Sequence, residues 1–323
     1  MERDYLFSGF LSKLSWQMAA TLTFVIVTFL QSVTIANSLG VREFGIWSSI
    51  VGFSVIASQL VDPRYLDFLL KFLTKLYIKE KEFIAKQLVY ICLLLSLFLL
   101  LITVLTSLLL VPIISDYFGL QVNNLQLILI LALVSTFSHT HFLTIFQAFF
   151  RVKGMVKELS IICIILYLFR YFSIFIALKF SDSGILGIST SFAFVNFIFM
   201  VFCLLFIRSR LSKRSFIENM KIKSLKENYK GAAIMLRRLH LSSIASIPQK
   251  ELDITILTVF SSPESIGIYR VAKNFVVALW AFVDGISLVI FPKITELHLK
   301  DNFTELRSMI IKLSLYTSLV LFT

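Results

Sequence analysis

Long uninterrupted runs of apolar residues constrain the fold of this chain more than any other feature. One such run, Leu88–Val111, contains no charged side chain. About 20 apolar residues in a helix cross the hydrocarbon core of a bilayer, and this run is long enough to do so. The chain is 58% apolar and 15% charged, whereas about a quarter of a soluble domain is charged. These values exclude an ordinary soluble enzyme, a disordered chain and a secreted disulfide scaffold. They predict an all-α, polytopic transmembrane bundle.

Eight segments are long and apolar enough, or nearly so, to span a membrane as helices. They are Leu14–Ala36, Phe44–Val61, Leu88–Val111, Leu125–Phe150, Leu159–Lys179, Gly184–Ile207, Leu239–Phe260 and Ile266–Phe291. A ninth begins near Ile310. The seventh is the weakest, because Pro248 and three charged residues interrupt it. Since proline removes a helical hydrogen bond, we expect a kink there.

The distribution of Lys and Arg between the loops predicts the orientation. With the N-terminus in the cytoplasm, the inner segments carry 25 basic residues and the outer segments carry 2. The net charge of +12 is therefore a topology signal and not a nucleic-acid footprint. The sequence predicts a multi-pass protein of the bacterial cytoplasmic (inner) membrane with a cytoplasmic N-terminus and no nucleic-acid partner.

The longest loop separates two groups of spans. We expect residues 1–207 to form a first lobe of six helices, and residues 239–323 to form part of a second lobe. That part comprises two helices and the start of a third. Residues 208–238, with ten basic and two acidic residues, resemble an amphipathic helix on the anionic inner leaflet. They link the lobes, and a role as a topology determinant alone stays open.

A short pattern occurs twice in the chain. Glu43-Phe44-Gly45-Ile46-Trp47 and Ser265-Ile266-Gly267-Ile268-Tyr269 each open a helix after an outer turn. Glycine permits close helix approach, and an interfacial aromatic residue suits the membrane surface. Because the offset between the two copies corresponds to about six helices, the pattern suggests two similar lobes, as in many transporters.

These motifs resemble those of a known family. Leu39-Gly40 together with Glu43-Phe44-Gly45-Ile46-Trp47 is similar to the first-hairpin signature of Wzx-type O-antigen and polysaccharide flippases. This family belongs to the multidrug/oligosaccharidyl-lipid/polysaccharide exporter superfamily. Asp253-Ile254, Gly267-Ile268-Tyr269-Arg270-Val271-Ala272 and Phe291-Pro292 resemble its second-lobe signature. The resemblance implies twelve or more helices in two lobes around a central cavity, so we expect the second lobe to be incomplete here.

Seven charged residues fall in the interior of predicted spans: Arg170, Lys250, Glu251, Asp253, Arg270, Lys273 and Asp284. Each costs roughly 2.5–3.5 kcal/mol at the centre of a helix that faces lipid. We therefore expect them to face one another or a wet cavity. Counting from the turn between the seventh and eighth segments, Asp253 and Lys273 lie at equal depth, about 10 Å. We predict that they pair.

The predicted substrate site uses these charges. Arg170, Lys250, Arg270 and Lys273 are candidates for binding an anionic lipid-linked substrate, with Asp253 and Asp284 as counter-ions. Internal ion pairing without a substrate is the alternative. On the first segment, Gln17, Thr21 and Gln31 share one helix face and are candidates for binding sugar hydroxyls; helix packing is the alternative there.

Catalytic, metal and cofactor motifs are not found in the sequence. The three cysteines, Cys92, Cys163 and Cys203, are scattered in apolar runs, and no phosphate-binding loop is present. We expect a non-enzyme without cofactor or metal. The resemblance implies a flippase that moves undecaprenyl-diphosphate-linked oligosaccharide from the inner to the outer leaflet by alternating access. Membrane lipids, a polysaccharide polymerase and other assembly proteins are the expected partners. A multidrug or cation antiporter of the same superfamily and a membrane polysaccharide polymerase are the alternatives.

Overall fold

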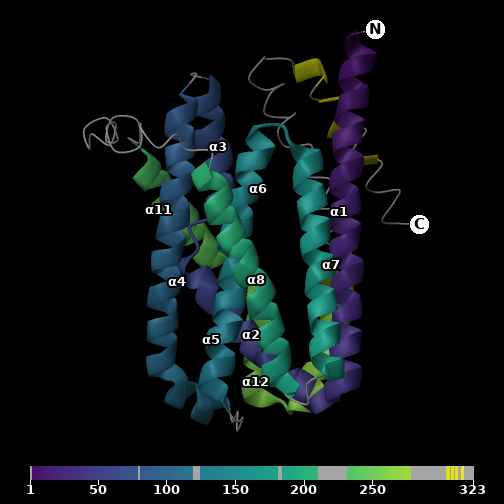
Figure 1. The fold of residues 1–323 in the computed structure, drawn as a ribbon, viewed down its shortest axis with the longest axis vertical. Helices are drawn as coiled ribbons and strands as arrows, with labels where there is room; N and C mark the ends of the chain where they lie inside the picture. Colours follow the sequence, from purple (N-terminus) through teal and green to yellow (C-terminus); the bar gives the residue numbers. More distant parts are fainter. Residues whose placement is uncertain are drawn as a thin grey trace.

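The protein is a bundle of long helices (Figure 1). The computed structural model describes residues 2–78, 81–118, 124–180, 184–209, 231–249 and 251–277, and residues 303–315 except 306, 309, 312 and 313. No strand occurs within these ranges. A helix satisfies all its backbone hydrogen bonds internally, which the apolar interior of a membrane requires. The predicted all-α membrane bundle is confirmed.

The helices occupy the following ranges. They are α1 (Glu2–Leu39), α2 (Val41–Val61), α3 (Tyr65–Ile78), α4 (Glu82–Phe118), α5 (Leu125–Phe137), the π-helix η1 (Ser138–Phe142), α6 (Leu143–Val152), α7 (Val156–Phe180), α8 (Gly184–Ser209), α11 (Ala232–Ala245), the 3₁₀ turn η2 (Ile247–Gln249) and α12 (Leu252–Phe260). Residues 263–277 and the described part of 303–315 are also helical. Within the described ranges, six helical stretches between Ser15 and Ser209 are long and apolar enough to cross a membrane, as the first six segments predict.

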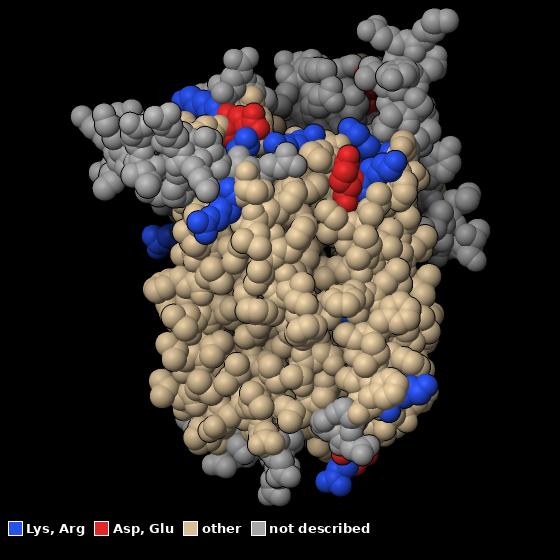
Figure 2. All heavy atoms as spheres, in the orientation of Figure 1, with Lys and Arg blue, Asp and Glu red and all other residues tan. Residues whose placement is uncertain are grey.

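The two ends of the bundle differ in charge. We call the end that holds the start of α1 and the turns α3–α4 and α6–α7 the basic end (top of Figure 1). The other end, which holds the α1–α2 turn at Gly40 and the turn at Ser261, is the turn end. On the face shown in Figure 2, Lys and Arg gather mainly at the basic end, and the middle is almost free of charge. A chain crossing a membrane several times has this pattern.

Apolar side chains divide between the interior and the lipid-facing surface. Phe146, Phe150 and Phe199 are buried where α6 meets α8, and α1 packs along α7. By contrast, Leu109 is 80% exposed and Phe180 is 78% exposed. Since exposed apolar side chains of this size are costly in water, they indicate a surface that faces lipid.

The segment at residues 62–87, predicted as a loop, contains a helix instead. Asp62 accepts a hydrogen bond from the Arg64 backbone N–H at 2.9 Å, and Arg64 has a φ of 52°. This turn ends α2, and α3 then follows with Leu69 and Leu73 buried. The segment is predicted as a loop because it contains several basic residues. The apolar residues of α3 nevertheless recur at helical spacing.

Two predicted spans are interrupted. Part of the segment Leu125–Phe150 forms η1, a wider helical turn that hydropathy does not reveal. The segment Leu239–Phe260 is not one helix: α11 ends at Ala245, η2 contains Pro248, and α12 begins at Leu252. The predicted kink at Pro248 is thus a complete break.

Several predictions fall outside the described residues. These are Lys250, Asp284, Phe291-Pro292, residues 210–230 of the linker and the eighth segment beyond 277. The described helix at the ninth segment includes residues 303–305, before the predicted start near Ile310. The division into two lobes stays a prediction.

Candidate functional site: an ion cluster between two helices

Lys273 and Asp253 form the ion pair that their depth predicts. Asp253 lies in the first turn of α12, and Lys273 lies on the helix of residues 263–277 that follows the turn at Ser261. The Lys273 Nζ atom is 2.7 Å from Asp253 Oδ1. The predicted pairing is confirmed. The two residues meet because the helices are antiparallel and each residue lies about 10 Å from the turn that connects them.

Glu251 is a second counter-ion, which the sequence analysis did not assign. It precedes α12, and its Oε2 atom is 2.6 Å from Arg270 Nη1 and 3.5 Å from Lys273 Nζ. The sequence contains a signal for this contact, because the number of residues from Glu251 to Arg270 is nearly the same as from Asp253 to Lys273. To use that signal one must know the residue at which α12 begins, and the break at Pro248 determines it.

Tyr269 completes the cluster. Its hydroxyl donates to Asp253 Oδ2 at 2.6 Å, and Asp253 Oδ1 also accepts from the Ile254 backbone N–H at 2.8 Å. Both carboxylate oxygens of Asp253 are therefore engaged. We name Glu251, Asp253, Tyr269, Arg270 and Lys273 the ion cluster.

The ion cluster is largely shielded and internally balanced. The side chains of Glu251, Arg270 and Lys273 are 13%, 15% and 13% exposed, and that of Asp253 is 36% exposed. Its two bases and two acids compensate each other. An anionic ligand that binds Arg270 or Lys273 therefore competes with a carboxylate for the same cation. Because a buried charge without a partner is costly, such an exchange requires the ligand to supply equivalent oxygens.

Arg170 lies apart from these contacts. It belongs to α7, and its guanidinium carbon is 4.6 Å from the centre of the Phe192 ring on α8. Its Nε atom is buried and has no hydrogen-bond partner among the described residues. A cation over an aromatic face is stabilised by the ring electrons. Arg170 is thus held by an aromatic ring, and no contact joins it to the ion cluster.

The predicted stripe on α1 is only partly accessible. Gln17 and Thr21 are half-buried, and Gln31 is 3% exposed. Next to Gln31, the buried Ser32 Oγ accepts a hydrogen bond from Asn274 Nδ2 at 2.6 Å. Helix packing thus accounts for Gln31. Asn274 is uncharged and is not among the predicted site residues.

The two copies of the glycine motif pack against each other. A Cβ atom added at Gly45 would lie 1.8 Å from the Pro263 carbonyl oxygen, and one added at Gly267 would lie 2.4 Å from the Val41 carbonyl oxygen. No side chain fits at either position. The close helix approach that the motif predicts is confirmed. We call this contact the glycine crossing.

An exposed ion pair borders the glycine crossing. The Arg42 Nε atom lies 3.6 Å from Glu264 Oε1, with the side chains 75% and 49% exposed. The pKa of Glu264 lies below its usual value, because its own backbone N–H and the Ser262 hydroxyl donate to the carboxylate and Arg42 adds positive charge. Both members of the pair are therefore charged at neutral pH.

A second polar group lies inside the first six helices, at η1. His141 is fully buried, with its Nε2 atom 3.1 Å from Ser58 Oγ, and it stacks on Phe137 at 4.3 Å. Nearby, Asn196 Nδ2 donates to Ser135 Oγ at 2.7 Å. These contacts join α2, α5 and α8 through η1, so their immediate effect is to fix the packing of the bundle.

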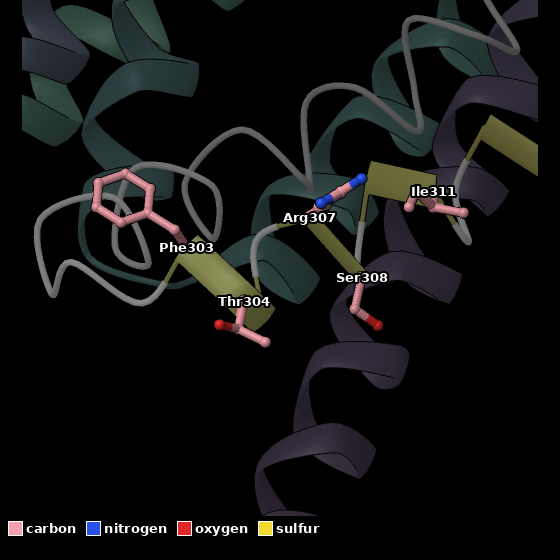
Figure 3. Close-up of a pocket in the computed structure, with 5 residues that line it drawn as sticks. All are labelled: Phe303, Thr304, Arg307, Ser308 and Ile311. Atoms are coloured by element: carbon pink, nitrogen blue, oxygen red, sulfur yellow. The ribbon is translucent and has the colours of Figure 1, made fainter.

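A pocket of about 560 Å³ lies elsewhere, along the helix near the end of the chain. Figure 3 shows its lining residues, which are Phe303, Thr304, Arg307, Ser308 and Ile311. All five come from one short stretch, and none belongs to the ion cluster. Within the described ranges, no group of three His, Cys, Asp or Glu side chains could hold a metal ion, and Cys92, Cys163 and Cys203 are free thiols.

Comparison with known proteins adds no further assignment. The chain matches no family model, no curated protein and no solved structure. The ion cluster and the glycine crossing are therefore the observations on which a functional proposal rests.

Proposed function

We propose that the chain belongs to the Wzx-type flippase family and translocates an undecaprenyl-diphosphate-linked oligosaccharide, a unit of O-antigen or related surface polysaccharide, across the membrane. The observation that carries this proposal is the ion cluster. Charged side chains inside a membrane bundle are costly and mark pathways for polar substrates. Arg270 and Lys273 provide donors that suit phosphate oxygens.

The proposed binding step is an exchange of partners. The diphosphate takes the positions of the Glu251 and Asp253 carboxylates, so Arg270 and Lys273 keep a negative partner throughout. Lys250 would add a third cation, and Asp284 would be a further counter-ion. Sugar hydroxyls would bind to Gln17 and Thr21, which are half-buried on α1. Rocking of two lobes would then expose the site on alternate sides, while the lipid tail stays in the bilayer.

The proposed setting follows from the charge of the two ends. The basic end would face the cytoplasm of a bacterium, with the protein in its inner membrane. Membrane lipids would surround the apolar middle of the bundle. A polysaccharide polymerase and other assembly proteins would take up the product at the turn end. The protein acts as a carrier in this proposal, not as an enzyme.

Paired neutralisation separates substrate binding from structural ion pairing. Lys273→Gln alone leaves Asp253 without its 2.7 Å partner, so loss of function in that variant could reflect misfolding. Lys273→Gln with Asp253→Asn removes both charges and keeps the shape. We expect this double variant to reach the membrane in normal amount but to leave the cells that depend on this chain without surface polysaccharide.

A matched pair at the basic end provides the control. Lys153 Nζ is 3.2 Å from Glu82 Oε1, and Lys153→Gln with Glu82→Gln should leave surface polysaccharide unchanged. If the Lys273/Asp253 double variant also supports normal surface polysaccharide, the cations do not bind substrate and the proposal fails.

One observation favours the antiporter alternative. Glu251 is a shielded carboxylate next to the partly exposed Asp253, and a proton or metal cation could occupy this pair when the bases move away. Efflux of cationic drugs from cells distinguishes the two functions. Drug efflux that requires Glu251, together with unaltered polysaccharide, would favour the antiporter.

A further inference from the structure

The glycine crossing joins two hairpins in a reciprocal manner. The first hairpin consists of α1 and α2, and the second consists of α12 and residues 263–277. Gly45 on the first hairpin meets the carbonyl of Pro263, and Gly267 on the second meets the carbonyl of Val41. Pro263 follows Val41 in the sequence at the same offset by which Gly267 follows Gly45. Each half of the contact is thus the counterpart of the other.

Two further contacts follow the same sequence offset. Asn274 donates a hydrogen bond to Ser32. At this offset Gly52 is the counterpart of Asn274, and Ile254 is the counterpart of Ser32. These two residues also lie close together, since a Cβ atom added at Gly52 would be 3.3 Å from Ile254 Cγ2. Arg42 and Glu264, which pair at the rim, are themselves separated by this offset. The two hairpins therefore cross with an approximate two-fold relation centred on the glycine crossing.

The contacts within the second hairpin differ in kind from those across the crossing. Within the hairpin, the ion cluster ties α12 to residues 263–277 through shielded ion pairs. Across the crossing, the contacts include neutral hydrogen bonds, from Thr258 to Ser49 at 2.9 Å and from Asn274 to Ser32, and the exposed pair at the rim. Exposed ion pairs contribute little, so ion pairing ties the second hairpin together internally more strongly than it ties that hairpin to the first.

We infer that the glycine crossing is a gate at the turn end, closed in this structure, which opens when the second hairpin moves away from the first. This inference rests on the proposed function, since a gate serves transport. Ser49 and Thr258 lie one turn further into the bundle than Gly45 and are 5% and 8% exposed. Opening the gate would expose them to water. The gate can close only if neither position 45 nor position 267 carries a side chain.

Alanine at the glycines tests the gate directly. Ser49→Cys serves as the reporter in a chain whose Cys92, Cys163 and Cys203 are replaced by alanine, purified and placed in lipid nanodiscs. We expect Gly45→Ala and Gly267→Ala each to raise the rate of labelling by a charged maleimide about tenfold, a shift of about 1.4 kcal/mol in the opening equilibrium. Gly52→Ala is the control, because its Cβ would meet only side-chain atoms, Ile254 Cγ2 at 3.3 Å and Glu251 Oε2 at 3.8 Å, and no backbone carbonyl. We expect it to label at close to the parent rate.

Unchanged labelling in both folded alanine variants would overturn the gate. If the alanine variants do not fold, Arg42→Cys with Glu264→Cys gives a second test in the glycine-containing chain. Joining these thiols with a short cleavable cross-linker should stop labelling of the reporter thiol at position 49, and cleavage should restore it. Labelling that persists in the cross-linked protein would also overturn the gate. Neither readout uses a substrate, so the gate and the proposed function can fail separately. If labelling responds as expected but cells without the protein still make surface polysaccharide, the proposed function is refuted and the gate is not.

Discussion

Glu251 joins the two bases of the ion cluster. Its carboxylate contacts both Arg270 and Lys273, whereas Asp253 shares its charge between Lys273, Tyr269 and a backbone N–H. The pairing of Asp253 with Lys273 could be predicted from the sequence, because counting residues from the turn fixes the depth of each. The contact of Glu251 with Arg270 has nearly the same spacing across the turn, but it depends also on the residue at which α12 begins, which counting from the turn does not give.

Removal of the Glu251 charge should destabilise the protein. Glu251→Gln leaves Arg270 without its 2.6 Å partner, and breaking a buried ion pair costs about 3–5 kcal/mol. We expect a value near the lower limit, since the cluster is partly exposed, measured as a lower midpoint of thermal unfolding in detergent. Glu251→Gln with Arg270→Gln should recover most of the loss. If the single variant is as stable as the parent protein, Glu251 does not hold the cluster together.

At the scale of elements, the break between α11 and α12 decides which parts meet. α11 is docked on the turn that follows α2: Arg64 Nη1 donates to Ser242 Oγ at 3.0 Å, and His240 Nδ1 is 3.2 Å from the Asp62 carbonyl oxygen. If α11 and α12 formed one straight helix, α11 and α12 could not both keep their present contacts with α2 and the turn that follows it. Pro248 makes this break predictable in position, whereas η1 is not predictable, since one additional residue per turn leaves the hydropathy pattern intact.

Pro248→Ala tests what causes the break. Alanine restores a backbone donor and removes the ring that excludes a continuous helix. We expect hydrogen exchange at residues 246–251 to slow by at least about tenfold as helix forms there. The exchange is measured by mass spectrometry of the purified protein. Exchange that stays fast would show that the flanking charged residues, and not the proline, terminate α11.

For the whole molecule, hydropathy and loop charge fix the spans but not how they pack. The six long helices between Ser15 and Ser209 follow from the length of the apolar runs. The glycine crossing was visible as a repeated motif, yet the contact of Gly45 with Pro263 and of Gly267 with Val41 required the three-dimensional arrangement. Sequence periodicity indicates which residues share one helix face but not which helix lies opposite.

The orientation in the membrane gives another test at this scale. A single cysteine placed at Gly154, in the turn at the basic end, and one at Glu264, at the turn end, should differ in reactivity in intact cells. Because basic residues stay in the cytoplasm, we expect a membrane-impermeant maleimide to label the cysteine at position 264 and not the one at position 154. The reverse pattern would invert the proposed direction of transport.

Transport by the purified chain tests the central claim most directly. The protein would be reconstituted into vesicles that contain a fluorescent undecaprenyl-diphosphate-linked oligosaccharide, and a quencher outside would report movement of the lipid between leaflets. We predict rapid movement with the unaltered chain and only the slow leak of protein-free vesicles with Lys273→Gln and Asp253→Asn combined. Equal rates for the two proteins, or no movement with either, would contradict a carrier that works through the ion cluster.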